Sequence, residues 1–63
     1  MSTKYQYPMP GPEIGVWADH PRYGEVLLRD KLESDTDSFW IIEDLDGELH
    51  IADEEDMSRY HVR

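Results

Sequence analysis

The sequence contains no cysteine, so neither a disulfide nor a cysteine-ligated zinc site can support the fold. It also lacks a long apolar run, because no stretch approaches the ~20 apolar residues that a membrane-spanning helix requires. The opening segment, MSTKYQYPMPGPE, has no apolar centre of the kind found in a secretory signal. These absences predict a chain that is not secreted, has no membrane partner, and is cytoplasmic or virion-associated.

Basic residues are scarce: six Lys and Arg stand against fifteen Asp and Glu, which gives a net charge of −9. Nucleic-acid binding depends on cations that displace counterions from phosphate, and here the six cations are spread along the chain. We therefore expect no direct nucleic-acid binding. An acidic surface instead favours a basic protein partner and speeds encounter with it, or it serves only solubility.

The chain has 63 residues, which is enough for one domain at most. A chain this short has little room for a ligand pocket of ~300 Å³ or more. The acidic residues lie in runs typical of solvated surface, the serines have no patterned base, and the three histidines have no recognised metal spacing. The sequence therefore predicts a protein that is not an enzyme and has no metal or cofactor.

Residues 1–12 differ in composition from the rest of the chain. Alternating prolines exclude a helix or a central strand and favour an extended polyproline arm. The arm carries Tyr5, Tyr7 and Met9, which are more apolar than a solvated end needs. We expect two parts, an arm over 1–12 that either docks or frays and a domain over 13–63.

The domain is predicted to be all-β, because short runs of β-forming residues alternate with Pro, Gly and acidic turns. A short 3₁₀ turn is expected within the acidic stretch 53–57. Five short strands with one such turn before the last is the order of a small SH3-like barrel. The expected strands are Ile14–Ala18, Glu25–Asp30, Ser38–Asp44, Glu48–Ala52 and Arg59–Val62.

The dipeptide Asp46-Gly47 between two strand-like runs predicts a β-hairpin with a two-residue type I′ loop. Counting outward from that loop sets Glu43 opposite His50 and Ile42 opposite Ile51. Strand alternation then places one apolar set in the core, and Ile42→Ala is expected to abolish folding. The predicted core is Ile14, Val16, Val26, Leu28, Trp40, Ile42, Leu49 and Ile51, with Met57, Tyr60 and Val62 completing it.

The same alternation places Phe39 and Ile41 on the outer face beside Ala52, with Leu27 as a neighbour. A half-buried strand normally carries polar residues there, and an exposed apolar patch commonly marks a partner site. Three explanations stay open. The arm folds back over the strip, another copy or another protein covers it, or the curvature of a barrel buries both faces.

The segments GVWADHPRYGEV and FWIIEDLDGELHIADEEDM resemble SH3-like barrels of the Tudor type. The resemblance covers residues 14–62 and implies an aromatic cage that reads methylated Lys or Arg by cation–π attraction. Trp17, Tyr23 and Phe39 would line that cage, with Asp19 or Glu43 adding negative charge. Leu45 stands where a cage aromatic is often found, so one wall would be weak. The alternative is that Trp17 and Tyr23 pack on each other to close one end of the barrel.

The sequence therefore favours a non-enzymatic protein-interaction module of the kind found among accessory or structural proteins of phages and bacteria, including an assembly subunit or homo-oligomer. Its contact energy would come from Phe39 and Ile41, with Trp17 and Tyr23. A nucleic-acid mimic that inhibits a nuclease or another nucleic-acid-binding protein is the first alternative, and the methyl-lysine or methyl-arginine reader is the second. The residues expected to steer a basic partner are Asp35, Asp37, Asp53, Glu54, Glu55 and Asp56.

Overall fold

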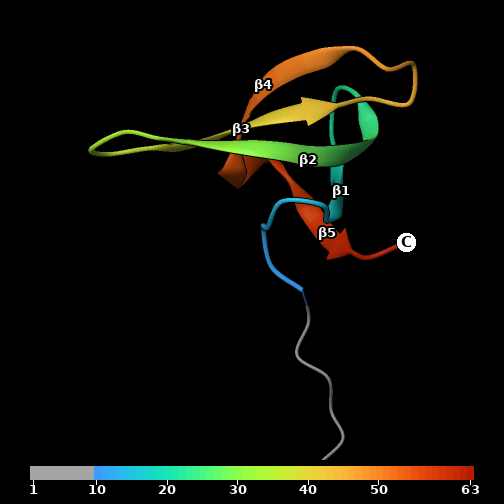
Figure 1. Ribbon diagram of the computed structural model, residues 1–63, viewed down its shortest axis with the longest axis horizontal. Coiled ribbons are helices and arrows are strands. Elements are labelled where there is room, and N and C mark those ends of the chain that lie inside the picture. The colour runs from blue at the N-terminus through green and yellow to red at the C-terminus, as the bar shows by residue number, and fades with distance from the viewer. Residues whose placement is uncertain (1–9) are drawn as a thin grey trace, which may run out of the picture.

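The computed structural model describes residues 10–63, and these form an all-β structure (Figure 1). All strands are antiparallel and lie in one sheet with the order β4-β3-β2-β1-β5. The elements are β1 (Trp17–His20), β2 (Gly24–Glu33), β3 (Ser38–Glu43), β4 (Leu49–Asp53), the 3₁₀ turn η1 (Glu54–Asp56) and β5 (Ser58–His61).

This architecture confirms the all-β class, the five strands and the single helical turn before the last strand within residues 10–63. The small antiparallel sheet is compatible with an SH3-like barrel. Tyr5, Tyr7 and Met9 of the predicted arm lie outside the described residues. Nothing between residues 10 and 63 has both the helical length and the hydrophobicity needed to cross a membrane.

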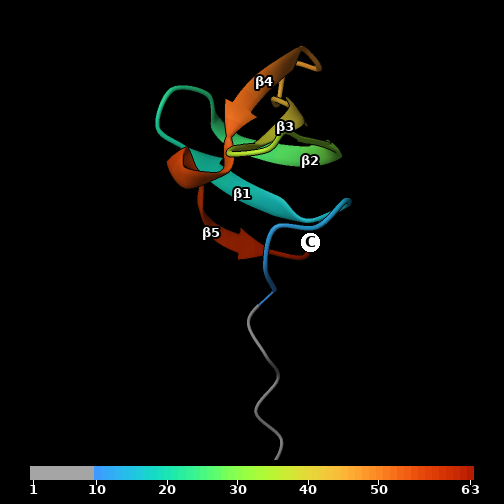
Figure 2. The same cartoon turned by 90° about the vertical axis from the view of Figure 1, so that its left-hand side faces the viewer.

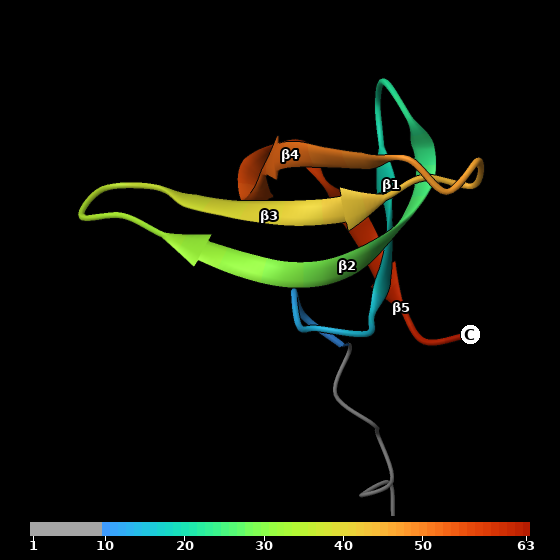
Figure 3. The same ribbon diagram turned by 45° about the horizontal axis from the view of Figure 1, so that its top comes forward.

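Two irregularities let the sheet curl. The β2–β3 register shifts between Leu28 and Asp30, and the β1–β5 register shifts between Trp17 and Asp19. Such bulges bend a strand and increase its twist. Figures 1 and 3 show the result: β2, β3 and β4 run side by side as a ribbon, and β1 crosses it steeply. Figure 2 shows β1 and β5 next to each other beneath the ribbon.

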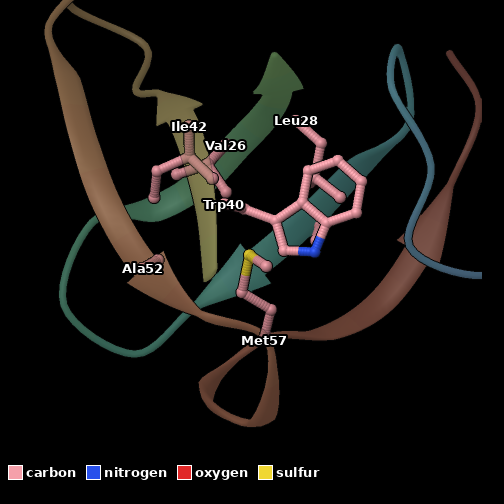
Figure 4. Close-up of a cluster of buried hydrophobic side chains, with 7 residues drawn as sticks. Val26, Leu28, Trp40, Ile42, Ala52 and Met57 are labelled. Atoms are coloured by element: carbon pink, nitrogen blue, oxygen red, sulfur yellow. The ribbon is translucent and has the colours of Figure 1, made fainter. Parts of the chain in front are cut away.

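The core lies on the concave side of the ribbon, because alternate residues of β2 and β3 point the same way. Figure 4 shows Trp40 turned toward Leu28 and Met57, the last of which follows η1. The buried set confirms the predicted core positions on β2 and β3, and Tyr60 packs against it as a partly buried residue. The buried residues are Val16, Ala18, Val26, Leu28, Trp40, Ile42, Ala52 and Met57.

The predicted hairpin register is wrong by one residue. Ile42 faces His50 and Ile41 faces Ile51, whereas a two-residue loop would set Ile42 opposite Ile51. The Gly47 N–H donates to the Asp44 carbonyl at 3.0 Å, and the Asp44 N–H donates to the Glu48 carbonyl at 2.9 Å. The loop therefore has three residues, of the type in which a turn ends on a glycine bulge. Gly47 has φ 86°, whereas a type I′ loop would also require a positive φ at the preceding aspartate.

The Asp44 side chain explains why the longer loop forms. Its Oδ1 accepts the backbone N–H groups of both Asp46 and Glu48, each at 2.9 Å. Aspartate readily accepts hydrogen bonds from the backbone two residues further along and so competes with strand pairing. The chain leaves β3 at Asp44 for this reason, so the residue that pairs with Glu48 is Asp44 and not Leu45, which the dipeptide signal suggests.

The shifted register reverses the faces of β4. Leu49 and Ile51 were expected in the core but are 62% and 67% exposed, and Ala52 was expected outside but is buried. His50 does not pair with Glu43 across the outer face as predicted, because it lies opposite Ile42 on the inner side. A one-residue slip always has this effect, since side chains alternate with a period of two.

Two further core predictions are wrong, both at the ends of strands. Ile14 is 66% exposed and Val62 is 72% exposed. Ile14 lies in a turn before Gly15, whose φ is 92°, so β1 begins at Trp17 rather than at Ile14. Val62 follows the last residue of β5. Both side chains lie beyond the regular part of the sheet, where alternation no longer determines burial.

Candidate functional site: an apolar face with acidic ends

The outer side of β3 and β4 carries a group of apolar side chains. We call Phe39, Ile41, Leu49 and Ile51 the apolar face, because alternation and the observed register place them on one side of the ribbon. Ile41 lies directly opposite Ile51. A shallow hollow of about 250 Å³ is lined by Ile41, Leu49, Ile51 and part of His50. Phe39 and Ile41 are only half-buried, and no described segment covers the two β4 residues.

The sequence predicts two of the four residues of this face. Phe39 and Ile41 lie on the outer side as predicted, but their β4 neighbours are Leu49 and Ile51 rather than Ala52. The missed signal was Asp44, which stands two residues before Asp46 and accepts its N–H. An aspartate at that position favours a longer loop and therefore the opposite face for every residue of β4.

The three predicted cage aromatics are not brought together. Trp17 lies on the outer side of β1 opposite Leu27, and the Arg63 guanidinium lies 4.5 Å from its ring centroid. Tyr23 stacks on His50 instead, with ring centroids 3.8 Å apart and planes 10° apart. Phe39 lies opposite Leu32 and Asp53, at the far end of β3. Trp17 and Tyr23 therefore make separate ring contacts.

Trp17 does border a second hollow, of about 300 Å³, beside the β3–β4 loop. Leu27 and Leu45 provide its other apolar walls, and Glu43 and Asp44 its carboxylates. This hollow adjoins the apolar face. Leu27 and Glu43, which line the hollow, lie in the same cross-strand row as Leu49 of the apolar face. Trp17 thus extends the outer surface toward β1 rather than forming a cage.

The predicted acidic residues converge at one end of the ribbon. Asp37, from the loop before β3, shares a hollow of about 140 Å³ with Asp53, Glu54 and Glu55. Asp35 and Asp56 are exposed nearby in the same two segments. Residues from segments 16 or more positions apart thus form one acidic surface, which the sequence alone presented as two separate runs.

Not all of these carboxylates are free to meet a partner. Glu54 Oε1 accepts the indole N–H of Trp40 at 2.9 Å and lies 3.9 Å from Lys31 Nζ. Asp53 caps η1 by accepting the Glu55 N–H at 2.9 Å. Glu54 is therefore part of the support for the core, whereas Asp37, Glu55 and Asp56 carry most of the unpaired charge at this end.

A second acidic group lies at the other end of β4, in and after the hairpin loop. Asp46 and Glu48 are exposed there, and Asp44 Oδ2 lies 2.8 Å from His50 Nε2. The hydrogen bond from His50, followed by those from the Glu48 and Asp46 N–H groups, lowers the pKa of Asp44 below its usual value. The apolar face is thus bordered by carboxylates at both ends.

Asp44, Glu48 and His50 place one ligand atom each within 4.8 Å of one another, which is a spacing that a divalent cation can use. The Asp44 carboxylate, however, is already occupied. Its Oδ1 accepts two loop N–H groups and its Oδ2 contacts His50. The two loop hydrogen bonds and the His50 contact therefore account for the position of the Asp44 carboxylate.

Comparison of the chain with protein-family models, with curated proteins and with solved structures gives no match.

Proposed function

We propose that this chain is a non-catalytic protein-binding module that binds a basic protein through its apolar face. The observation that carries the proposal is that Ile41, Leu49 and Ile51 form an open hollow on a sheet whose two ends are acidic. Isolated apolar residues on a surface are ordinary, but an adjoining group rimmed by polar residues commonly marks an interface.

The energetic contribution expected from this face is substantial. Burying an exposed Leu or Ile side chain is worth roughly 1.5–3 kcal/mol, and both β4 residues of the face are more than half exposed. Two or three such side chains, if they fill a pocket on a partner, can serve as the central contacts of a small interface. The module needs no cavity of its own, which suits a domain of this size.

The charge distribution supports a basic partner. With fifteen acidic residues against six basic ones, the chain attracts a cationic protein over long range. Such steering acts mainly on the association rate and is screened by salt, whereas apolar contact acts mainly on the dissociation rate. The two contributions can therefore be separated by measuring both rates at increasing ionic strength.

The test compares the tagged wild-type chain with Ile51→Ser and with the matched control Val62→Ser, which alters an equally exposed aliphatic residue beyond β5. Proteins retained by the wild type are identified, purified and measured by surface plasmon resonance. We expect a basic partner that the control binds normally and Ile51→Ser binds at least tenfold more weakly, with kon falling as salt rises and koff nearly constant. Equal binding by both variants would refute the proposal.

A nucleic-acid mimic is the second candidate, and the convergence of Asp37 with Asp53 and Glu55 favours it. Carboxylates gathered in this way could occupy the cationic groove of a nuclease or another nucleic-acid-binding protein. Its affinity would fall steeply with salt, by analogy with phosphate binding, and would be unaffected by Ile51→Ser. The Tudor-type reader of methylated Lys or Arg has less support, because Trp17, Tyr23 and Phe39 lie apart.

A further inference from the structure

Strand β4 is at an edge of the sheet, because its single neighbour among the described residues is β3. Hydrogen bonding alternates along an antiparallel pair, and Asp44 bonds to Glu48 at the start of this one. The bonded pairs are therefore Ile42 with His50 and Trp40 with Ala52. It follows that the backbone N–H and C=O groups of Leu49, Ile51 and Asp53 point away from β3.

The free backbone groups and the exposed side chains thus belong to the same residues. Leu49 and Ile51 direct their N–H and C=O groups outward along the sheet, and they direct their side chains onto the apolar face. A strand that paired with β4 would gain ladder hydrogen bonds and would also place its own side chains beside these two. This combination is what β-strand addition to a sheet edge requires.

The edge of β4 lacks three of the features that normally protect an edge strand. Proteins blunt exposed edges with lysine, proline, bulges or inward-pointing charge. β4, with the sequence LHIAD, has neither lysine nor proline, and its register with β3 is regular. The opposite edge differs: β5 carries Arg59 with φ 56°, and its pairing with β1 is interrupted by a register shift. β5 is therefore a protected edge and β4 an open one.

The charges on either side of β4 select the occupant. Asp46 and Glu48 precede the strand, and Glu55 and Asp56 follow it. A second copy would bring acid to acid in either direction: antiparallel pairing about Ile51 sets Leu49 against Asp53 of the other copy and brings the two acidic ends together. Parallel pairing aligns each acidic end with itself. Like charges placed opposite each other destabilise a sheet, and each copy has a net charge of −9.

We propose that β4 accepts an extended segment of a basic protein as an antiparallel sixth strand, with apolar residues opposite Leu49 and Ile51 and with Lys or Arg at both ends. This inference rests on the proposed function and specifies how the partner binds. The segment extends the apolar face by one strand, and its basic ends lie beside the carboxylates of the hairpin loop and of η1.

The first test uses the peptide Lys-Arg-Thr-Val-Thr-Val-Thr-Lys-Arg and the full chain, followed by NMR titration. In an antiparallel pair with β4, the residues opposite Leu49 and Ile51 turn their N–H groups toward β4 and their side chains onto the apolar face. Methylating the two valine N–H groups should therefore weaken binding at least tenfold, whereas methylating the first and third threonine N–H groups should change it less than threefold. Replacing the terminal basic residues with Glu should abolish binding.

Ile51→Lys, which places an edge-protecting cation at the centre of β4, should weaken the peptide at least tenfold, and Val62→Lys should not. If both methylated peptides bind like the parent, or if the parent peptide does not bind, strand addition is wrong. The proposed function is tested separately, because the Ile51→Ser comparison with the natural partner does not depend on this peptide.

Amide hydrogen exchange in the free chain identifies competing occupants. We expect the Leu49 and Ile51 N–H groups to exchange at least tenfold faster than that of Ile42, which bonds across to His50. Protection of Leu49 and Ile51 that appears only at high protein concentration would assign the edge to a second copy. Protection at every concentration that is lost on deleting residues 1–9 would assign it to the chain's own N-terminal segment. Either result would overturn the proposal.

Discussion

The two faces of the β3–β4 ribbon have nearly the same apolar character but opposite environments. On the inner face, Trp40 and Ile42 are almost completely buried, and on the outer face Leu49 and Ile51 are largely exposed. Ile41 and Ile42 are neighbours in the chain and identical in chemistry, yet only one belongs to the core. Hydrophobicity therefore does not decide burial in this protein; the direction of each side chain relative to a very small core does.

This difference explains how a 63-residue chain can hold both a core and a binding surface. The concave side of the ribbon is closed by β1, β5 and the segment around Met57, whereas no described segment covers the convex side. Among residues 10–63, Leu49 and Ile51 on the convex side stay largely exposed. The cost is a core of few residues, so each core side chain carries a large share of the stability.

The largest expected effect distinguishes the two faces directly. Ile42→Ala should cost about 2–5 kcal/mol, because it removes a fully buried side chain and leaves a cavity. A domain this small has on the order of 3–5 kcal/mol in total, so we expect no cooperative thermal transition by circular dichroism. Ile41→Ala is the matched control and should retain a cooperative melt. If both variants lost the cooperative transition, the inner and outer faces of the ribbon would contribute equally to stability, and the distinction between them would be wrong.

The second prediction concerns the β3–β4 loop, because its length sets the register of β4 and so decides which residues of β4 face outward. Gly47 has φ 86°, so Gly47→Ala should cost about 1–2 kcal/mol through backbone strain. The control is Gly11→Ala, at a glycine with no positive φ and nothing within 4 Å of the added methyl group, and it should change stability by less than about 0.5 kcal/mol. Urea unfolding measures both variants. If the two variants lost the same free energy of unfolding, the three-residue loop with its positive φ at Gly47 would be wrong.

A third prediction concerns two neighbouring carboxylates of η1, which we expect to contribute differently to stability. Glu54 accepts the indole N–H of Trp40 at 2.9 Å, so Glu54→Ala should cost about 1–2 kcal/mol. Glu55 is exposed and only its backbone is engaged, so Glu55→Ala should be close to neutral. Urea midpoints compare the two, and the fluorescence of Trp40 should shift only in the first variant. If Glu55→Ala lowered the urea midpoint more than Glu54→Ala, the role of Glu54 as a support for the core would be wrong.

The smallest expected effect is a change in the pKa of His61, which lies on β5 at the protected edge of the sheet. The Arg59 carbonyl contact at 2.7 Å and the Glu25 carboxylate at 2.9 Å raise the pKa of His61 above its usual value. A raised pKa stabilises the fold below the unfolded-state pKa of about 6.5, and that contribution is lost as pH rises through the folded-state value. Glu25→Gln should lower the pKa of His61, measured by NMR, whereas Glu48→Gln should leave it unchanged. An unaltered titration in Glu25→Gln would refute the ion pair.

Much of the fold could be predicted because its signals are local. β-forming runs separated by Pro, Gly and acidic turns indicate five strands, and alternation within β2 and β3 identifies Val26, Leu28, Trp40 and Ile42 as core. The register of β4 could not be read in the same way. It depends on two hydrogen bonds that the Asp44 carboxylate accepts from the N–H groups of Asp46 and Glu48, and these bonds compete with the Asp-Gly turn signal.

The candidate site was predictable only in part for the same reason. Phe39 and Ile41 follow from β3 alone, whereas Leu49 and Ile51 depend on the pairing between two strands. The acidic residues were recognised as two runs, and only the packing of η1 against the loop before β3 joins them.

The sequence by itself determined the class of fold, the sign of the surface charge and the alternation of side chains along each strand, because these depend on residue type and on neighbours in the chain. Only the tertiary structure decided which side of β4 faces outward, that β4 is an edge of the sheet formed by residues 10–63, and that the acidic runs meet. These features depend on contacts between distant segments, and a shift of one residue in a single loop is sufficient to reverse them.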